Sequence, residues 1–177
     1  NKHLVAFDIL LPSFLTYTQT IALKDKEKKA INYLTLWNRD ASVSSIATTI
    51  AIEWANLWSK EIPAAKTEEA TTQIIKKYEQ MVTEVSDEKK LSLLNTALTQ
   101  LETAYGKWEI PWGDINRYQR VNPGESMNDN APSWAVGQTS SKWGSLPAFE
   151  SKRYENTLKR YGYSGSSFIA AVSFGKK

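Results

Sequence analysis

The sequence of 177 residues contains no cysteine and a single histidine, His3. The lack of cysteine excludes disulfide bonds, thiolate nucleophiles and cysteine-ligated zinc within the chain. A catalytic triad or metal site that needs histidine would have to use His3, and a lone histidine near a chain start is more often a solvated side chain. The His-Glu-x-x-His, Walker and Gly-x-Gly-x-x-Gly motifs are missing too. We therefore expect no metal and no nucleotide cofactor.

Long apolar runs and a strong net charge are missing as well. No run approaches the roughly 20 apolar residues that span a bilayer, so we expect a soluble chain without a membrane partner. The 22 basic and 19 acidic residues give a net charge of +3 and are scattered along the chain. The nearest approach to a basic cluster, residues 152–163, holds only four basic residues. We interpret it as a solvated helix or loop face and expect no nucleic-acid partner.

What the chain does contain is a globular composition, with 41% hydrophobic and 23% charged residues. A chain of this length can bury one sizeable core, so we expect residues 1–177 to form a single domain or a piece of one. Seven tryptophans is a high count. Such bulky aromatic residues usually fill cores or line apolar pockets.

The first part, about residues 1–106, shows the three-and-four spacing of apolar residues that is typical of helices. The stripe from Leu4 to Ile21 predicts a long first helix with a kink or a restart at Pro12. A charged turn is expected at residues 24–29, followed by a second helix over about residues 30–37.

Cap signals place the remaining helices. Ser42 or Ser44 is predicted to cap a third helix, and Thr67 and Ser86 precede acidic residues in the way that helix starts do. Gly106 lies where a left-handed C-terminal stop is expected. One seam of apolar residues defines the last helix: Leu91, Leu94, Leu98, Leu101 and Tyr105.

After Gly106 the helical period disappears and proline, glycine and asparagine become frequent. Residues 122–132 have the composition of an exposed loop. Residues Ser167 to Phe174 give the best strand, because β-branched and aromatic residues alternate with small ones. The sequence thus predicts an α+β fold, with a helical first part at about residues 1–106 and a loop-rich β part at about residues 107–177.

Two patterns imitate catalytic sites. Ser86-x-x-Lys89, Ser126-x-Asn128 and Lys142-x-Gly144 follow the order of the three elements of serine β-lactamases. They fall within 59 residues, too few to build the domains that hold such elements apart, and Ser86 is explained by helix capping.

The second imitation is a pair of carboxylates, Glu109 and Asp114. They flank a short Pro-Trp-Gly segment and could approach each other as a general acid and base do. We interpret them instead as hydrogen-bond acceptors in a turn, with Arg117 or Arg120 as the donor.

Three blocks of the chain carry a resemblance to a known family. They are AINYLTLWNRDASVSSIATTIAIEW at residues 30–54, GKWEIPWGDINRYQR at 106–120 and GYSGSSFIAAVSFG at 162–175. In this order they resemble the later part of the β-chain of the penicillin acylase family, amide hydrolases with an N-terminal nucleophile. Short motifs match: Leu34, Trp37 and Ser45, then Leu101, Gly106, Trp112 and Gly113, and finally Gly165. Three positions depart from the family pattern: Asn38 and Ser44 replace acidic residues, and Asn116 replaces a histidine.

The resemblance implies amide hydrolysis by a serine at the start of the mature β-chain, with its own α-amine as the base and an asparagine in the oxyanion hole. Substrates in that family pair an apolar acyl group with a polar amine, as in penicillins and acyl-homoserine lactones. None of these catalytic groups transfers to a residue of this chain. We therefore expect a fragment or processed piece of an αββα fold, inactive alone and partnered by the nucleophile-bearing region and the α-chain. Relatives are commonly exported, so the resemblance implies a periplasmic or extracellular location.

The expected role of most residues is then structural. Trp37, Trp54 and Trp58 are predicted to pack helices together, while Trp112 and Trp134 are the candidates for contact with a substrate or with missing strands, although core packing is favoured for the tryptophans as a class. One alternative is a non-enzymatic module that binds carbohydrate or peptide through the tryptophan-bearing loops at 108–143. Another is a helical scaffold for a protein partner, which would show an exposed apolar patch.

Overall fold

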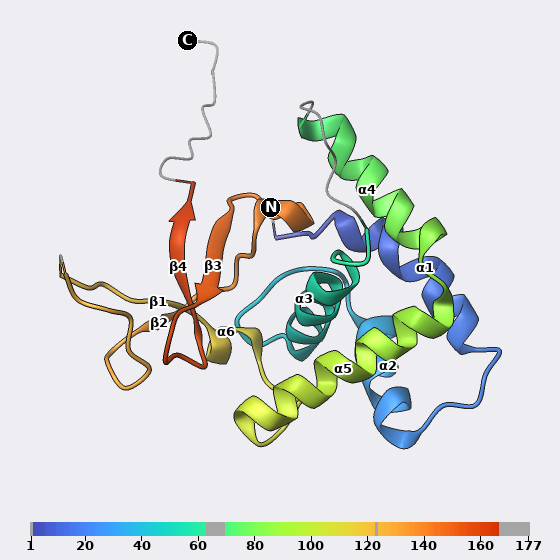
Figure 1. Ribbon diagram of the computed structural model, residues 1–177, viewed down its shortest axis with the longest axis horizontal. Helices are drawn as coiled ribbons and strands as arrows, with labels where there is room; N and C mark the ends of the chain where they lie inside the picture. The colour runs from blue at the N-terminus through green and yellow to red at the C-terminus, as the bar shows by residue number, and fades with distance from the viewer. Residues whose placement is uncertain (1, 63–69, 123, 167–177) are drawn as a thin grey trace, which may run out of the picture.

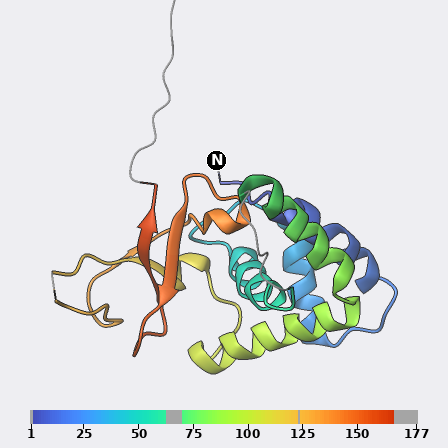
Figure 2. The ribbon, with the colours of Figure 1, turned by 45° about the horizontal axis from the view of Figure 1, so that its top comes forward.

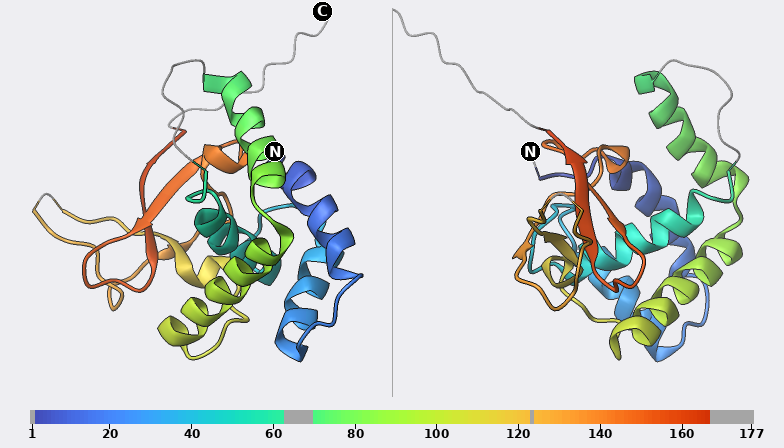
Figure 3. Two further views of the ribbon diagram at one scale, coloured as in Figure 1. Left: turned by 45° about the vertical axis from the view of Figure 1, so that its right-hand side comes forward. Right: turned by 60° about the vertical axis from the view of Figure 1, so that its left-hand side comes forward.

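The computed structural model describes residues 2–62, 70–122 and 124–166. The chain forms an α+β fold in which helices come first and a four-stranded mixed sheet follows, as the sequence predicted. Helices gather on one side of the molecule and strands on the other, with α3 between them (Figures 1 and 3). The helices are α1 Ala6–Thr18, α2 Asp25–Leu36, α3 Ile46–Trp58, α4 Ala70–Glu84, α5 Asp87–Tyr105 and α6 Trp112–Ile115, with a 3-10 turn η1 at Ser141–Trp143. The strands are β1 Asn116–Tyr118, β2 Trp134–Ala135, β3 Phe149–Arg153 and β4 Arg160–Gly165.

Helix α5 confirms both of its predicted ends. The Ser86 hydroxyl accepts a hydrogen bond from the Lys89 amide at 3.2 Å, which satisfies one of the free amides of the first turn. At the other end Gly106 adopts φ +76° and its amide donates to the Glu102 carbonyl at 2.8 Å. A left-handed residue of this kind ends a helix at little cost only when it is glycine.

Helix α3 is capped by Ser45, so the prediction of Ser42 or Ser44 was wrong. The Ser45 hydroxyl accepts from the Thr48 amide at 3.0 Å. The hydroxyls of Ser42 and Ser44 instead lie 3.4 Å from each other. Three serines within four residues were too close to separate by sequence, because any serine can satisfy the cap.

The charged segment 24–29 is not a turn but the first part of α2. Glu27 supports this start because its carboxylate accepts from the Lys24 amide at 2.7 Å, near the positive end of the helix. Its other oxygen accepts from the Asn95 side chain at 2.7 Å, which joins α2 to α5. Of the kink or restart predicted at Pro12, the restart is wrong, since α1 continues through it. Pro12 and Asp8 both lie on the exposed face, where water can serve the carbonyl that proline leaves without a donor.

Two tryptophans fill the centre of the helical part, as predicted. Trp54 and Trp58 are fully buried, with ring centroids 5.0 Å apart. Each indole donates a hydrogen bond of 2.9 Å, Trp54 to the Lys90 carbonyl and Trp58 to the Met81 carbonyl. The two indole rings of α3 therefore hydrogen-bond to the backbone of both α4 and α5. Trp37 is also buried at 8% exposure.

The sheet has the strand order β2-β1-β4-β3 (Figure 2). The β1–β4 pair is parallel and the other two pairs are antiparallel. Strands β3 and β4 form a hairpin that contains residues 152–163, so this segment consists of two strand ends joined by a loop at 154–159 and is not a helix face. Gly162 allows the hairpin to close, since a Cβ there would lie 2.3 Å from the Phe149 ring. The strand predicted at 167–174 and the helix start predicted at Thr67 lie outside the described residues.

In the segment predicted as a loop, residues 122 and 124–132 carry no helix or strand. None of the helices in the described ranges is long and apolar enough to cross a membrane.

Candidate functional site

The first two blocks that carry the family resemblance meet at one backbone junction. The Trp112 amide donates to the Ser45 carbonyl at 3.1 Å, and the Gly113 amide donates to the Val43 carbonyl at 2.8 Å. A Cβ on Gly113 would lie 2.8 Å from the Val43 Cβ and 3.0 Å from the Ala135 Cβ. Only glycine therefore lets α6 lie this close to the loop before α3.

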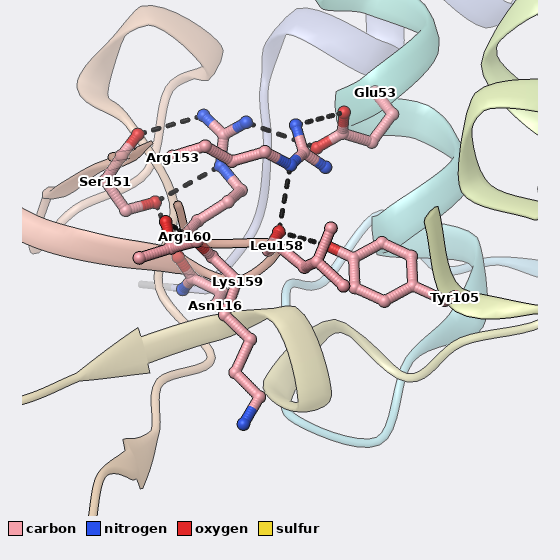
Figure 4. Close-up of polar contacts among 9 residues, drawn as sticks. Glu53, Tyr105, Asn116, Ser151, Arg153, Leu158, Lys159 and Arg160 are labelled. Atoms are coloured by element: carbon pink, nitrogen blue, oxygen red, sulfur yellow. Dashed lines mark hydrogen bonds and ion pairs between the residues drawn. The ribbon is translucent and has the colours of Figure 1, made fainter. Parts of the chain in front are cut away.

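Asn116 extends this junction into the sheet. Its side chain is fully buried, and its Nδ2 donates to the carbonyls of Val136 at 2.8 Å and Gln138 at 2.9 Å. Its Oδ1 accepts from the Ser151 hydroxyl at 2.6 Å (Figure 4). One carboxamide thus ties β1 to the segment after β2 and to β3, using both its donor and its acceptor. Asn116 holds backbone here, at the position where the family carries a histidine.

An ion-pair network joins the hairpin to α3. The carboxylate of Glu53, whose side chain is 11% exposed, accepts from Nη1 of Arg153 and of Arg160, each at 3.2 Å. Arg160 also donates to the Ser151 carbonyl at 2.9 Å. Both guanidinium groups point toward Glu53 from the hairpin (Figure 4). Because one carboxylate faces two guanidinium groups, this network keeps an excess of positive charge.

Beside this network two adjoining cavities open between α3, η1 and the hairpin. The first encloses about 170 Å³ and the second about 310 Å³. They share three lining residues: Asn56, Lys142 and Arg160. We call the joined space the α3 cleft. It is the candidate site because charged, hydroxyl, amide and aromatic side chains from distant parts of the chain converge on it.

Lys142 lies where the two cavities join. Its Nζ donates to the Ser59 hydroxyl at 2.9 Å and lies 4.6 Å from the centroid of the Trp143 ring. Burial, together with the neighbouring charges of Lys77, Lys60 and Arg160 and against the opposing effect of Glu150, lowers the pKa of Lys142 to about 8. The amine therefore titrates well below the range of an ordinary lysine and is still mainly charged at neutral pH.

Glu150 lies on the other wall of the first cavity. Its carboxylate accepts from the Ser141 amide at 2.8 Å and from the Ser141 hydroxyl at 2.9 Å. Burial acts to raise the pKa of Glu150, but hydrogen bonds from Ser140 and Ser141 and the charge of Lys142 outweigh it, and the pKa is lowered. The carboxylate is therefore held ionised by its own loop.

The two tryptophans singled out from the sequence occupy different environments. Trp112 is 1% exposed and lies in the wall of the first cavity, with its indole directed at the Gln138 carbonyl at 3.4 Å. Trp134 is 60% exposed on β2, where its ring centroid lies 6.0 Å from that of Tyr118. The structure places Trp112 at the α3 cleft and Trp134 outside the residues that line it.

The residues of the apparent serine–lysine pattern are not brought together. Ser86 caps α5, and Lys142 bonds to Ser59 instead. Ser126 lines a separate space of about 330 Å³ together with Asn128.

Of the two flanking carboxylates, Glu109 has other partners than those predicted. Glu109 accepts from Lys29 at 2.7 Å and from the Tyr33 hydroxyl at 2.8 Å, so the expectation of Arg117 or Arg120 was wrong. The Lys29 hydrogen bond is the main reason that the pKa of Glu109 is lowered. Arg117 uses its guanidinium on the backbone carbonyls of Gly113 and Ser133.

His3 is not simply solvated. Its Nε2 lies 2.8 Å from Asp8 and its Nδ1 lies 3.4 Å from Asp40, with the side chain 34% exposed. The Asp8 hydrogen bond raises the pKa of His3, because a carboxylate stabilises the charged imidazole. In the described ranges, no group of three or more acidic or histidine side chains is arranged to hold a metal ion.

Sequence inspection missed the residues that define the α3 cleft, namely Glu53, Lys142, Arg153 and Arg160. One signal was present, since the basic and aromatic segment 152–163 contains both arginines. Its basic residues were too few for a nucleic-acid footprint, yet they face a carboxylate on α3 rather than solvent alone.

The fold and the junction at Gly113 define a mixed α+β scaffold with a polar cleft at its centre. The chain belongs to the penicillin amidase family, since the family model described as penicillin amidase matches residues 2–177. This match confirms the resemblance drawn from the sequence and indicates an acylase-like hydrolase at the level of the family. A comparison with curated proteins gave no match.

Proposed function

We propose that the chain is a non-catalytic part of a self-processing acylase, whose attacking serine lies on polypeptide outside these residues. The complete enzyme cleaves the amide between an apolar acyl group and a polar amine, as in penicillins or acyl-homoserine lactones. The chain supplies helices, strands and the wall of a cleft to that enzyme, and it is inactive alone. Its partners are the nucleophile-bearing region and the α-chain, and the family resemblance favours an exported enzyme.

The observation that carries this proposal is that the family's motif residues make structural contacts. Backbone hydrogen bonds or close backbone contacts engage Ser45, Trp112 and Gly113. The Asn116 side chain donates to loop carbonyls and accepts from the Ser151 hydroxyl. Groups committed in this way position elements rather than react with a substrate. Together with a family match along residues 2–177, this supports a scaffold role within an amide hydrolase.

The test compares the isolated chain with the full product of its native gene. Each is incubated with a phenylacetyl amide and with a long-chain acyl-homoserine lactone, and release of the free amine is measured. We expect turnover by the full product and none by the chain alone. Turnover by the isolated chain, or a native gene that encodes only these residues, contradicts the proposal.

A variant of this chain separates scaffolding from chemistry. In the full product, Gly113→Val forces apart α6 and the loop before α3, so we expect less folded, processed enzyme. The rate per active site, counted by titration with a serine-reactive acylating reagent, should remain close to that of the wild type. A matched control is Thr103→Val, which places valine at an exposed position of α5 away from the junction. A large fall in rate per active site in Gly113→Val alone would assign the junction to catalysis.

The alternative of a tryptophan-based binding module now depends on few residues. Trp108, Trp112 and Trp143 are at most 8% exposed and belong to the core. The exposed aromatic pair of Tyr118 and Trp134 is the surface that such a module would use. Binding of an oligosaccharide or peptide array to the wild-type chain, lost in Trp134→Ala, would favour this second function.

A further inference from the structure

The α3 cleft carries more positive than negative charge. Its lining includes four cations, Lys60, Lys142, Arg153 and Arg160, and two carboxylates, Glu53 and Glu150. Lys77 of α4 adds to the positive potential felt at Lys142. An excess of like charge in a partly enclosed space raises the local concentration of oppositely charged ligands.

Both carboxylates are already engaged. Glu53 accepts from two guanidinium groups, and Glu150 accepts from the backbone and side chain of Ser141. In the part of the chain that the structure describes, no carboxylate oxygen lies within 4.0 Å of the Lys142 Nζ, which bonds only to the neutral Ser59 hydroxyl. A half-buried ammonium without an ion pair is unfavourable, and an anion in the cleft would remove that penalty.

Two residues with neutral hydrogen-bonding groups line the same space. Thr139 is 1% exposed and lines the first cavity, and its Oγ1 has no hydrogen-bond partner among the described residues. A buried hydroxyl without a partner is uncommon in folded proteins and calls for a ligand or water beside it. Asn56 lines both cavities, and its carboxamide likewise makes no hydrogen bond within the described ranges.

We propose that the α3 cleft binds a small molecule through an oxyanion, either a carboxylate or a phosphate, held by Lys142 with Thr139 and Asn56 as further donors. The shared chemistry is a charged group with at least two acceptor oxygens, which one ammonium and two neutral donors can satisfy together. Ile52 and Trp143 provide an apolar wall in the first cavity for the body of the ligand. This site does not depend on the acylase proposal, since its residues lie on this chain.

The experiment titrates the 177-residue chain with two probes, inorganic phosphate and malonate, and follows heat release and amide chemical shifts at constant ionic strength. Chloride sets the baseline, and the neutral malonamide controls for shape without charge. We expect saturable binding of at least one probe at a single site, with shifts at Thr139, Lys142 and Asn56. Phosphate alone, or malonate alone, identifies which kind of oxyanion the cleft prefers.

Three variants locate the site. Lys142→Gln removes the central charge and should weaken binding about tenfold. Lys107→Gln removes the same charge at an exposed position outside the cleft and should leave the affinity unchanged. Thr139→Val removes only the hydroxyl and should weaken binding about fivefold.

Loss of binding in these variants can be distinguished from loss of folding. Lys142→Gln relieves crowding among cations, and Thr139→Val removes a buried polar atom without a partner, so both variants should unfold at or above the wild-type temperature. The proposal is overturned if neither phosphate nor malonate binds saturably. It is equally overturned if Lys142→Gln and Lys107→Gln weaken binding to the same extent, because the effect would then be one of net charge.

Discussion

The helical part and the strand part of this chain are stabilised by different kinds of contact. In the helical part, backbone groups are satisfied within each helix, and apolar faces pack around buried rings such as Phe14, Trp54 and Trp58. In the strand part the strands are two to six residues long, so much of the backbone lies in loops. Buried polar side chains bond to these loops, as Asn116 does with Val136 and Gln138.

The long loop after β1 shows the same principle. Gln119 donates to the Asn128 carbonyl at 2.8 Å and accepts from the Asn128 amide at 2.9 Å, in place of a strand neighbour. Asp129 then accepts from the Leu158 amide at 2.6 Å at the turn of the hairpin. In this loop, side chains satisfy the backbone amide and carbonyl groups that other backbone groups satisfy in the helices. The comparison predicts that apolar truncation is most costly in the first part and loss of single polar groups in the second.

The largest effect is expected from Trp54→Ala in the helical core. Trp54 is fully buried and its indole bonds to the Lys90 carbonyl, so truncation leaves a cavity and an unpaired acceptor. We expect a loss of about 4 kcal/mol in the free energy of unfolding, measured by urea denaturation. Leu36→Ala, at a side chain that is 76% exposed, is the control and should change little. A similar loss in both variants would contradict the proposed core.

Asn116→Ala tests the polar counterpart in the strand part. The change removes three hydrogen bonds, those to the carbonyls of Val136 and Gln138 and the one from the Ser151 hydroxyl. We expect a loss of about 3 kcal/mol, since each such bond contributes on the order of 1 kcal/mol. Asn130→Ala, at an exposed side chain in the nearby loop, serves as the control. If Asn116→Ala cost no more than this control, polar clamping would not explain the second part.

The contact between the two parts is tested by Gly113→Ala. The new methyl group would lie 2.8 Å from the Val43 Cβ and 3.0 Å from its carbonyl oxygen, so backbone must shift. We expect a loss of about 2 kcal/mol from overpacking, in the same urea assay. Gly106→Ala introduces only a left-handed alanine in open space and should cost about 1 kcal/mol. Equal losses would mean that the junction tolerates a side chain.

The same difference explains what could be predicted from the sequence. The seam of α5, its Ser86 cap and its Gly106 stop are local patterns within 21 residues, and all were confirmed. The β3–β4 hairpin was missed because Phe149–Arg153 carries charged residues and no β-branched ones, and its pairing is set by partners further along the chain.

The α3 cleft could not be predicted for the same reason. Glu53 and Arg160 are 107 residues apart in the sequence, and only the folded backbone brings them within hydrogen-bond distance. Lys142 carried no local signal of burial, because it lies between Ser141 and Trp143 in a short 3-10 turn without a periodic pattern. The family resemblance singled out Trp112 and Gly113, which the structure places at the junction with the loop before α3, but it gave no information about charges that meet across the chain.

The smallest effect is expected from pH, at the point where the two parts share the cleft. The pKa of Lys142 is about 8 in the folded chain, below its ordinary value of 10.5, through burial and the charges of Lys77, Lys60 and Arg160, with Glu150 opposing. Below pH 8 the lysine is charged in both states, and the folded state carries the full penalty of that charge. Above pH 8 the folded state releases the proton while the unfolded state keeps it, so the penalty declines.

The free energy of unfolding of the wild type, relative to Lys142→Gln, should therefore rise between pH 7 and pH 10. We expect a change of about 1 kcal/mol, reduced from the full pKa shift because solvent screens a partly exposed lysine. Urea denaturation of both chains at several pH values measures it, and Lys107→Gln, which removes the same charge outside the cleft, provides the reference. A difference between wild type and Lys142→Gln that stays constant over this range would show that Lys142 is no more crowded than an exposed lysine.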